Sequence, residues 1–347
     1  MTSRSKLAIT AGFLVSIGVV ACGGSSTPTP SGPTAQLPVN IVVASNTLAF
    51  MDAYVAQGAG TFNSAGLAPN WVGVVPNAAQ ALATVTSGSA DVVNLACSAP
   101  IAAVAANRPV VIFAGGSIGV TSFVVISKAK ADALAKQGIT PTSPIADRLK
   151  ALKGMTIGTG SAGGPTELNV RIALESVGIN PDKDVKFQSG TPDAEFAAFK
   201  SGQLDANVQG VPNALQVTLD KTGVVWISGP NGDVPQWNKG YFLCWVTSQA
   251  FAQAHADVLK RLIAGLQTTS DLIKNDRTAS LAALKKSFTT LDPNLLAASF
   301  DAQRKSYITD PNVKKSVMQD TIDLYNASAP TKVSLTPEDL VPTGFLS

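Results

Sequence analysis

The sequence motif that decides the fold occurs twice, first as Ser87-Gly88-Ser89-Ala90-Asp91-Val92 and again as Ser201-Gly202-Gln203-Leu204-Asp205-Ala206. Each copy follows an alanine-rich segment and precedes a short apolar run. In both copies the glycine is expected to supply the left-handed residue that ends a helix, after which the chain enters a buried strand. One Ser-Gly-x-x-Asp could arise by chance, but two at matching places predict two similarly built lobes. The repeat also explains Asp91 and Asp205, which we interpret as structural residues.

Around each copy, short β-rich runs alternate with helical stretches of about ten residues, a pattern typical of parallel βαβ units. The expected strands are 39–44, 68–75, 91–96, 109–115 and 122–127 in the first unit, and 155–158, 185–188 and 205–208 in the second. A further strand at 241–247 is expected to return to the first lobe. The sequence therefore predicts an α/β fold with two similar lobes of mixed or parallel sheet flanked by helices. Two crossovers between the lobes would act as a hinge.

The last third of the chain is predicted to be helical. Ser248 is expected to cap a long helix that contains His255, the sole histidine, on a solvated face. Further helices are expected at 278–288, 293–307 and 311–325, the last two with proline at the first helical position. We assign no function to the histidine.

The N-terminus has the pattern of an export signal. Arg4 and Lys6 precede an uncharged run, Leu7–Ala21, that is shorter than the ~20 residues a membrane-spanning helix needs. The tetrad Val19-Val20-Ala21-Cys22 resembles a bacterial lipobox, and this resemblance implies that the Cys22 thiol carries a lipid. A plain secretory peptide with an incidental cysteine is the alternative. Residues 23–38, rich in Gly, Ser, Thr and Pro, then form a flexible tether.

These features divide the chain into a lipoprotein signal peptide (1–22), the tether (23–38) and two lobes. The first lobe combines 39–127 with 241–347, and the second comprises 128–240. We expect an exported protein, anchored by lipid to a bacterial membrane and facing the periplasm or the cell exterior.

Composition excludes several classes of function. Of the 347 residues, 45% are apolar and 14% charged, which is not the composition of a disordered chain. The net charge of +3 would fall to +1 once the leader is removed, so no nucleic-acid partner is expected. One histidine and three cysteines leave little material for a metal site, and neither a metal nor a cofactor is predicted. Export permits a Cys97–Cys244 disulfide, but two buried free thiols are the expectation.

Several short sequence motifs, taken in their order along the chain, resemble those of a known protein family. They are Tyr54-Val55-Ala56-x-Gly58, Thr61-Phe62-x-x-Ala65-Gly66-Leu67, Leu152-Lys153-Gly154-Met155-Thr156-Ile157-Gly158 and the two repeated phrases. Over 39–346 the set resembles the solute-binding proteins of ABC importers for nitrate, sulfonates, taurine and thiamine-pyrimidine precursors. The resemblance implies a periplasmic-binding-protein-like fold of type II, a small-molecule solute, and permease and ATPase subunits as partners. A monomer is expected. The stretch 160–167 also resembles TRAP-type receptors, and a sensor domain stays an alternative.

The candidate binding residues follow from the rule that ligands bind beyond the carboxyl ends of strands in open α/β sheets. They come from strand-end loops of both lobes and from the connection that leaves the second lobe. The set is Ser45, Asn46, Thr47, Cys97, Ser98, Ser161, Ala162, Gly163, Gly164, Thr166, Ser189, Gln209 and Trp237. The strand-end loops contain no Lys or Arg, which favours a neutral polar, aromatic or weakly anionic solute over a multiply charged one.

The glycine-rich loop allows a second interpretation. Residues 158–163 match the G-x-G-x-x-G pattern of dinucleotide sites, but the following strand ends in Phe187-Gln188 and lacks the acidic residue that would bind ribose. We expect instead that free N–H groups at a helix N-terminus contact an anionic or polar ligand, with a plain tight turn as the alternative.

Three further residues receive an expected position. Phe50 and Asp52 are placed at the mouth of the cleft, and Arg171 on the surface.

Family members that act as thiamine-pyrimidine synthases use a Cys-rich motif and a His. This chain has isolated cysteines and a single helical His, so we do not expect an enzyme.

Overall fold

The structure is a computed structural model that describes residues 36–75, 77–160, 162–329 and 331–347. The predicted signal peptide, its lipidation site Cys22, nearly all of the tether and the candidate Ser161 lie outside the described residues. In the part of the chain that is described, no helix has both the length and the apolar character needed to cross a bilayer.

The first sheet has five strands in the order β2-β1-β3-β10-β4. Their bounds are Leu37–Val43 for β1, Leu67–Val74 for β2, Val92–Ala96 for β3, Val110–Ile118 for β4 and Tyr241–Ser248 for β10. Strands β1, β2 and β3 run parallel, whereas β10 lies antiparallel between β3 and β4. The predicted return of the chain to the first sheet through residues 241–247 is confirmed.

The second sheet repeats this arrangement in the order β7-β6-β8-β5-β9. It consists of β5 (Phe123–Ser127), β6 (Thr156–Gly158), β7 (Lys186–Gln188), β8 (Ala206–Gln209) and β9 (Gly223–Ser228). Again three strands are parallel and one, β5, is antiparallel to its neighbours β8 and β9. The predicted α/β class with two similar mixed sheets is confirmed.

One strand was assigned to the wrong sheet. The run 122–127 was expected to continue the first sheet, but β5 pairs only with β8 and β9 of the second. The chain therefore leaves the first sheet at Ile118, before β5, and not after Ser127. The apolar run signals a buried strand but carries no information on its partner, which explains the error. The remaining lobe boundaries stay a prediction.

The repeated phrase has the same structural role in both halves. Asp91 Oδ2 accepts a hydrogen bond from the backbone N–H of Asn40 at 2.7 Å, and Asp205 Oδ2 accepts one from Thr156 N–H at 2.9 Å. The backbone N–H of each aspartate in turn donates to the carbonyl of the same partner residue. Each aspartate thus joins the residue before one parallel strand to the neighbouring strand, at the middle of β1 for Asp91 and at the start of β6 for Asp205. The structural interpretation of both aspartates is confirmed.

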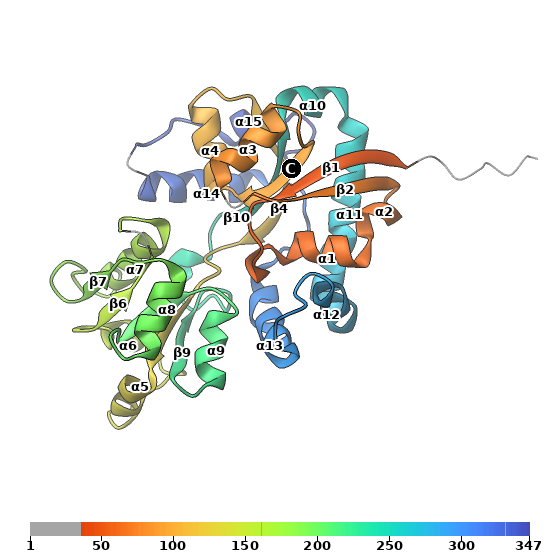
Figure 1. Cartoon of the computed structure of the whole chain (residues 1–347). Coiled ribbons are helices and arrows are strands. Elements are labelled where there is room, and N and C mark those ends of the chain that lie inside the picture. Colours follow the sequence, from red (N-terminus) through yellow and green to blue (C-terminus); the bar gives the residue numbers. More distant parts are fainter. Residues whose placement is uncertain (1–35, 76, 161, 330) are drawn as a thin grey trace, which may run out of the picture. The chain divides into compact units, whose positions relative to one another are not determined.

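Helices flank both sheets (Figure 1). Those around the first are α1 (Met51–Ala59), α2 (Thr61–Ser64), α3 (Ala78–Thr86), α4 (Ser98–Ala105), α10 (Gln249–Ala254), α11 (Ala256–Asn275), α12 (Arg277–Lys285), α13 (Pro293–Gln303), α14 (Lys315–Ser328) and α15 (Pro337–Leu340). Those of the second are α5 (Lys128–Ala135), α6 (Ile145–Lys150), α7 (Pro165–Glu175), α8 (Pro192–Lys200) and α9 (Asn213–Leu219). Helix α1 packs on α11 and α12, while α4 packs on α3, α14 and α15. The described residues also form three short 3-10 helices: η1 (Leu48–Phe50), η2 (Pro235–Trp237) and η3 (Arg304–Ser306).

Two helix predictions need correction. Ser248 caps only the short α10, and His255 stands between α10 and α11 with its ring 4.5 Å from that of Phe251. The helix expected from Pro311 begins at Lys315. Pro311 instead uses its carbonyl to accept the N–H of Gly115, so this part of the chain pairs with β4 before α14 begins.

The expectation of two free thiols is also wrong. Cys97 and Cys244 form a disulfide, with their Cα atoms 5.2 Å apart. Cys97 follows directly after β3, and β10, which carries Cys244, is the antiparallel neighbour of β3. The 147 residues between the two cysteines hide this proximity in the sequence.

Candidate ligand-binding pocket

The two segments that connect the sheets pair with each other. Gly119 N–H donates to the carbonyl of Gly240 at 3.0 Å, and Val120 N–H donates to the carbonyl of Trp237 at 2.9 Å. Gly119 has φ of 77°, and a Cβ at this position would lie 2.6 Å from the Trp237 carbonyl oxygen. Only glycine fits both conditions, so the close approach of the two crossovers depends on this residue.

A pocket of about 240 Å³ lies against this pair of crossovers. It takes residues from the end of β3 and α4, from both crossovers with the start of β10, from α7, and from α14. The lining residues are Ala96, Ser98, Ile101, Gly119, Val120, Thr121, Ser122, Thr166, Asn169, Ile172, Gln236, Trp237, Lys239, Gly240, Tyr241, Phe242, Thr321, Leu324 and Tyr325. Segments attached to both sheets therefore line one cavity.

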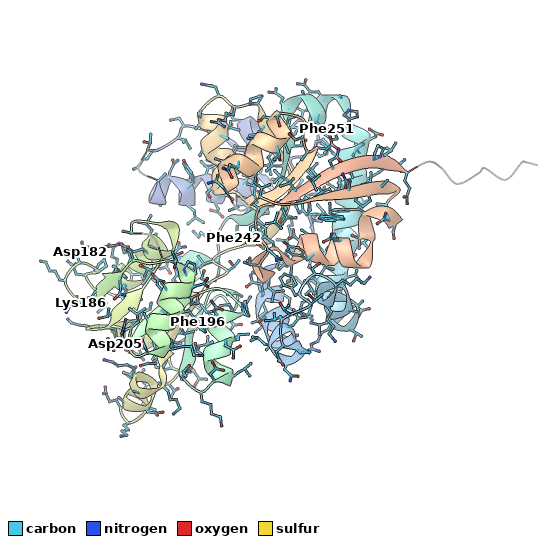
Figure 2. The ribbon with its side chains drawn as sticks, in the orientation of Figure 1. Asp182, Lys186, Phe196, Asp205, Phe242 and Phe251 are labelled. Atoms are coloured by element: carbon cyan, nitrogen blue, oxygen red, sulfur yellow. A yellow bond between two sulfur atoms is a disulfide. The ribbon has the colours of Figure 1, made fainter. Side chains whose placement is uncertain are left out.

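Aromatic side chains form a large part of its wall. Trp237 is buried and its indole N–H donates to the carbonyl of Asn169 at 2.9 Å, which fixes the ring against α7. The Tyr241 hydroxyl accepts the backbone N–H of Lys314 at 2.9 Å. Phe242, which is labelled in Figure 2, follows on β10 and is half-buried. With their polar groups already bonded within the protein, Trp237 and Tyr241 offer the pocket mainly apolar surface.

The charge of the pocket comes from one residue. Among the described residues that line it there is no Asp or Glu, and Lys239 is the sole Lys or Arg. The absence of cations that we noted in the strand-end loops does not extend to the whole lining, because Lys239 belongs to the second crossover. A search restricted to strand ends missed it.

The structure brings three of the predicted binding residues together. Ser98, Thr166 and Trp237 all line the pocket. Ser98 opens α4 two residues after the end of β3, Thr166 lies in the first turn of α7, and Trp237 belongs to the second crossover.

The other described candidates lie outside this pocket. Ser45 bonds Thr47 through their hydroxyl groups at 3.3 Å, and its carbonyl accepts the Tyr54 hydroxyl at 2.8 Å. Gln209 is buried and donates to the carbonyl of Pro192 at 3.3 Å, while Cys97 is consumed by the disulfide. The remaining candidates absent from the lining are exposed or partly exposed: Asn46, Ala162, Gly163, Gly164 and Ser189.

The glycine-rich loop does not offer the free N–H groups that we expected at two of its positions. Gly160 N–H donates to Glu195 Oε1 at 2.7 Å, and Gly163 N–H donates to Glu167 Oε2 at 3.2 Å. Burial raises the pKa of the Glu195 carboxyl, and hydrogen bonds from the loop's backbone act against that shift. Carboxylates of the chain itself therefore occupy positions that we had assigned to a ligand.

Asp52 lies in the core and not at a cleft mouth. Its Oδ2 accepts the indole N–H of Trp245 at 2.9 Å and the amide of Asn94 at 3.3 Å. Burial raises the pKa of Asp52 to about 6, although these hydrogen bonds oppose the shift. Phe50, which was placed with it, is also buried.

Arg171, which was expected on the surface, is partly exposed and lies outside the pocket lining. It pairs with Glu167 at 2.7 Å and with Asp182 at 2.6 Å.

Among the described residues no group of three His, Cys, Asp or Glu side chains could hold a metal ion.

Several solved structures share this fold. The Escherichia coli periplasmic aliphatic sulphonate binding protein SsuA aligns with a TM-score of 0.60 and 19% identity over 77% of this chain and 84% of its own. A periplasmic sulfonate-binding protein SsuA of Methylobacillus flagellatus KT aligns with a TM-score of 0.64 and 17% identity over 90% and 97%. The desulfurization enzyme DszB also aligns, with a TM-score of 0.60 and 12% identity over 89% and 97%.

Sequence comparison gives a family. Among curated proteins none matches this chain. The family model described as the NMT1-like family matches residues 39–285, which is more than half of the chain. Together with the paired mixed sheets, this match identifies the protein as a member of the NMT1-like family.

Proposed function

We propose that this protein is the extracytoplasmic solute-binding receptor of an ABC importer. The observation that carries the proposal is the pocket at the paired crossovers, whose lining comes from segments attached to both sheets. The SsuA proteins that share the fold are periplasmic binding proteins by name, and one is described as part of a sulfonate ABC transporter. The pocket is lined by segments attached to both sheets, and two short connections join these sheets. This arrangement suits a receptor that closes on its solute.

The proposed solute is a small organic molecule that is polar, aromatic or weakly anionic. The aromatic wall of Trp237, Tyr241 and Phe242 supports an apolar body, and Ser98 and Thr166 supply hydroxyl groups that can bond a polar head. Binding would favour the closed arrangement because only that arrangement contacts the solute from both sheets. The energy of closure then comes from the difference in solute contacts between the two states.

The proposal includes a location and partners. A receptor with a lipid on Cys22 would be held at the outer face of a membrane, where the permease, driven by the ATPase subunits on the cytoplasmic side, would receive the closed, loaded form. We propose that it acts as a monomer and without a cofactor. A TRAP-type importer or a signalling protein would need the same binding domain with a different partner, and the neighbouring genes would distinguish these cases.

An enzyme is the second candidate, and one observation favours it. DszB, an enzyme, shares the fold at 12% identity. The pocket described here contains hydroxyls, one amine and aromatic rings, but the one histidine of the chain lies elsewhere, between α10 and α11. The nearby cysteines are joined in a disulfide, which removes them as nucleophiles.

The test is a thermal-shift screen of small acids, sulfonates, amino acids and aromatic compounds, followed by calorimetry on each hit. A solute that binds the folded state raises the melting temperature. Thr166→Val, which keeps the shape and removes the pocket hydroxyl, should weaken binding by about ten-fold. Thr142→Val, on the exposed surface, is the matched control and should leave affinity unchanged. Sustained turnover of a bound compound would contradict a receptor.

A further inference from the structure

Lys239 is placed to select the charge of whatever enters the pocket. It lies on the second crossover between Trp237 and Tyr241, and its side chain is exposed. Among the described residues no carboxylate lies within ion-pairing distance of its ammonium group. At the edge of an otherwise uncharged cavity, this cation therefore lacks a counter-charge from the described residues.

The acidic residue of α7 that follows the pocket residue Thr166 is already neutralised. Glu167 is buried, pairs with Arg171 at 2.7 Å and accepts the N–H of Gly163. The Glu167 carboxylate is therefore already bonded to its own helix, through Arg171, and to the glycine-rich loop, through Gly163. The charge that a ligand meets in the pocket is that of Lys239 alone.

The glycine-rich loop does not compete for an anion at the two positions where its N–H groups are bonded. Gly160 donates to Glu195 and Gly163 to Glu167, and an anionic head approaching those N–H groups would meet two carboxylates. Repulsion between like charges disfavours this approach. Within the pocket, in contrast, an anion meets one ammonium group together with the hydroxyls of Ser98, Thr121, Ser122 and Thr166.

From this arrangement we infer that Lys239 is the specificity-determining residue of the pocket, selecting an organic monoanion whose apolar body packs on the aromatic wall. The inference rests on the proposed function and adds the charge class of the solute and the residue that reads it. A second negative charge on the ligand would have no cation to meet, and burying an unpaired charge is costly. A cationic ligand would be repelled by the same ammonium group.

The experiment compares three one-ring probes of nearly equal shape on the full-length protein: benzoate, the neutral benzamide and the dianion phthalate. Calorimetry should show benzoate binding at least about ten-fold more tightly than either other probe. Lys239→Gln should reduce the benzoate affinity to that of benzamide and leave benzamide binding unchanged. Lys239→Arg should retain the preference for benzoate. Lys136→Gln, which removes an exposed lysine directly after α5, is the matched control and should change nothing.

Two results would overturn the inference: equal affinity for benzoate and benzamide in the unmodified protein, or an unchanged preference in Lys239→Gln. Failure of all three probes to bind would overturn it as well. The proposed function is judged separately, by whether any compound of the thermal-shift screen binds. A neutral or cationic hit there would keep the receptor and remove the role of Lys239.

Discussion

The indole N–H of Trp245 donates to Asp52 Oδ2 across 2.9 Å, joining the antiparallel strand β10 to the first turn of α1. Both residues are buried, and the second oxygen of the carboxyl, Oδ1, has no hydrogen-bond partner among the described residues. The core of the first lobe therefore contains a carboxyl group that is only partly compensated when it is ionised. This relationship makes stability depend on pH.

Stability should fall as pH rises through the range in which Asp52 ionises. Burial raises its pKa from 3.8 to about 6, so the folded state holds the proton more tightly than the unfolded state does. The resulting stabilisation is complete below pH of about 4 and is lost as pH rises through about 6. The total change is on the order of 3 kcal/mol. Asp52→Asn should remove this dependence while still accepting the indole N–H.

Denaturant unfolding at a series of pH values measures the effect as the difference between the Asn variant and the unmodified protein. Asp220→Asn is a useful comparison, because a hydrogen bond from Lys200 lowers the pKa of Asp220. Its removal should alter the pH dependence in the opposite direction. Parallel pH profiles for Asp52→Asn and the unmodified protein would show that Asp52 ionises normally.

Reduction of the Cys97–Cys244 disulfide should destabilise the protein and loosen one wall of the pocket. The bond closes a long loop, and losing such a constraint typically costs about 2–4 kcal/mol. Ser98 and Phe242, which line the pocket, are adjacent in sequence or in space to the bond, since Cys97 N–H also donates to the Phe242 carbonyl. Hydrogen exchange at residues 96–101 and 241–244 should increase in the Cys97→Ser/Cys244→Ser variant.

Dithiothreitol should leave the melting temperature of the Cys97→Ser/Cys244→Ser variant unchanged, whereas it should lower the melting temperature of the unmodified protein. No effect of the reductant on the unmodified protein would mean that the two thiols are not joined under the conditions used.

Gly119→Ala should weaken the pairing of the two crossovers. The added Cβ would lie 2.6 Å from the Trp237 carbonyl oxygen, and φ of 77° disfavours any L side chain. Gly138→Ala is the matched control, because Gly138 has φ of 79° but nothing within 4 Å of the added Cβ. We expect Gly119→Ala to cost about 1–3 kcal/mol more than the control, since it adds a clash to the same backbone strain. Equal losses in thermal unfolding would exclude the clash.

Asp91→Ala and Asp205→Ala should each destabilise the protein by about 1–3 kcal/mol without changing solute affinity. Each change removes the side-chain acceptor of a backbone N–H group in the neighbouring strand, that of Asn40 in β1 in one case and that of Thr156 in β6 in the other. Chemical unfolding gives the first quantity and calorimetry the second. A selective loss of binding would contradict the structural interpretation of these aspartates and assign them a role in solute binding.

Local patterns allowed much of the fold to be predicted. The strands, the two similar sheets and the roles of Asp91 and Asp205 follow from spacing within a few dozen residues. Pairing over long distances did not follow: the run Phe123–Ser127 was placed in the wrong sheet, and Cys97 and Cys244 were taken to be free. Apolar periodicity records burial and not the identity of the neighbour.

The candidate site was predicted in part, because the strand-end rule considers only loops. It reached Ser98 and Thr166, and the connection that leaves the second lobe supplied Trp237. Lys239 stood two residues further along that connection, and its lack of an acidic neighbour becomes visible only in three dimensions. The bonds from Gly160 to Glu195 and from Gly163 to Glu167 were likewise hidden, because no sequence pattern marks which carboxylate reaches a loop.

The position of β10 between β3 and β4 has a consequence for biogenesis. As the polypeptide emerges, N-terminus first, the edge strand β4 has no partner in the first sheet until Tyr241–Ser248 arrives. The second sheet, whose strands all lie between Phe123 and Ser228, is available in full before then. The first sheet is thus completed after the second, although most of its strands are synthesised earlier. A nascent chain stopped before Tyr241 would leave the backbone groups of β3 and β4 that face β10 without a partner strand and open to pairing with another protein.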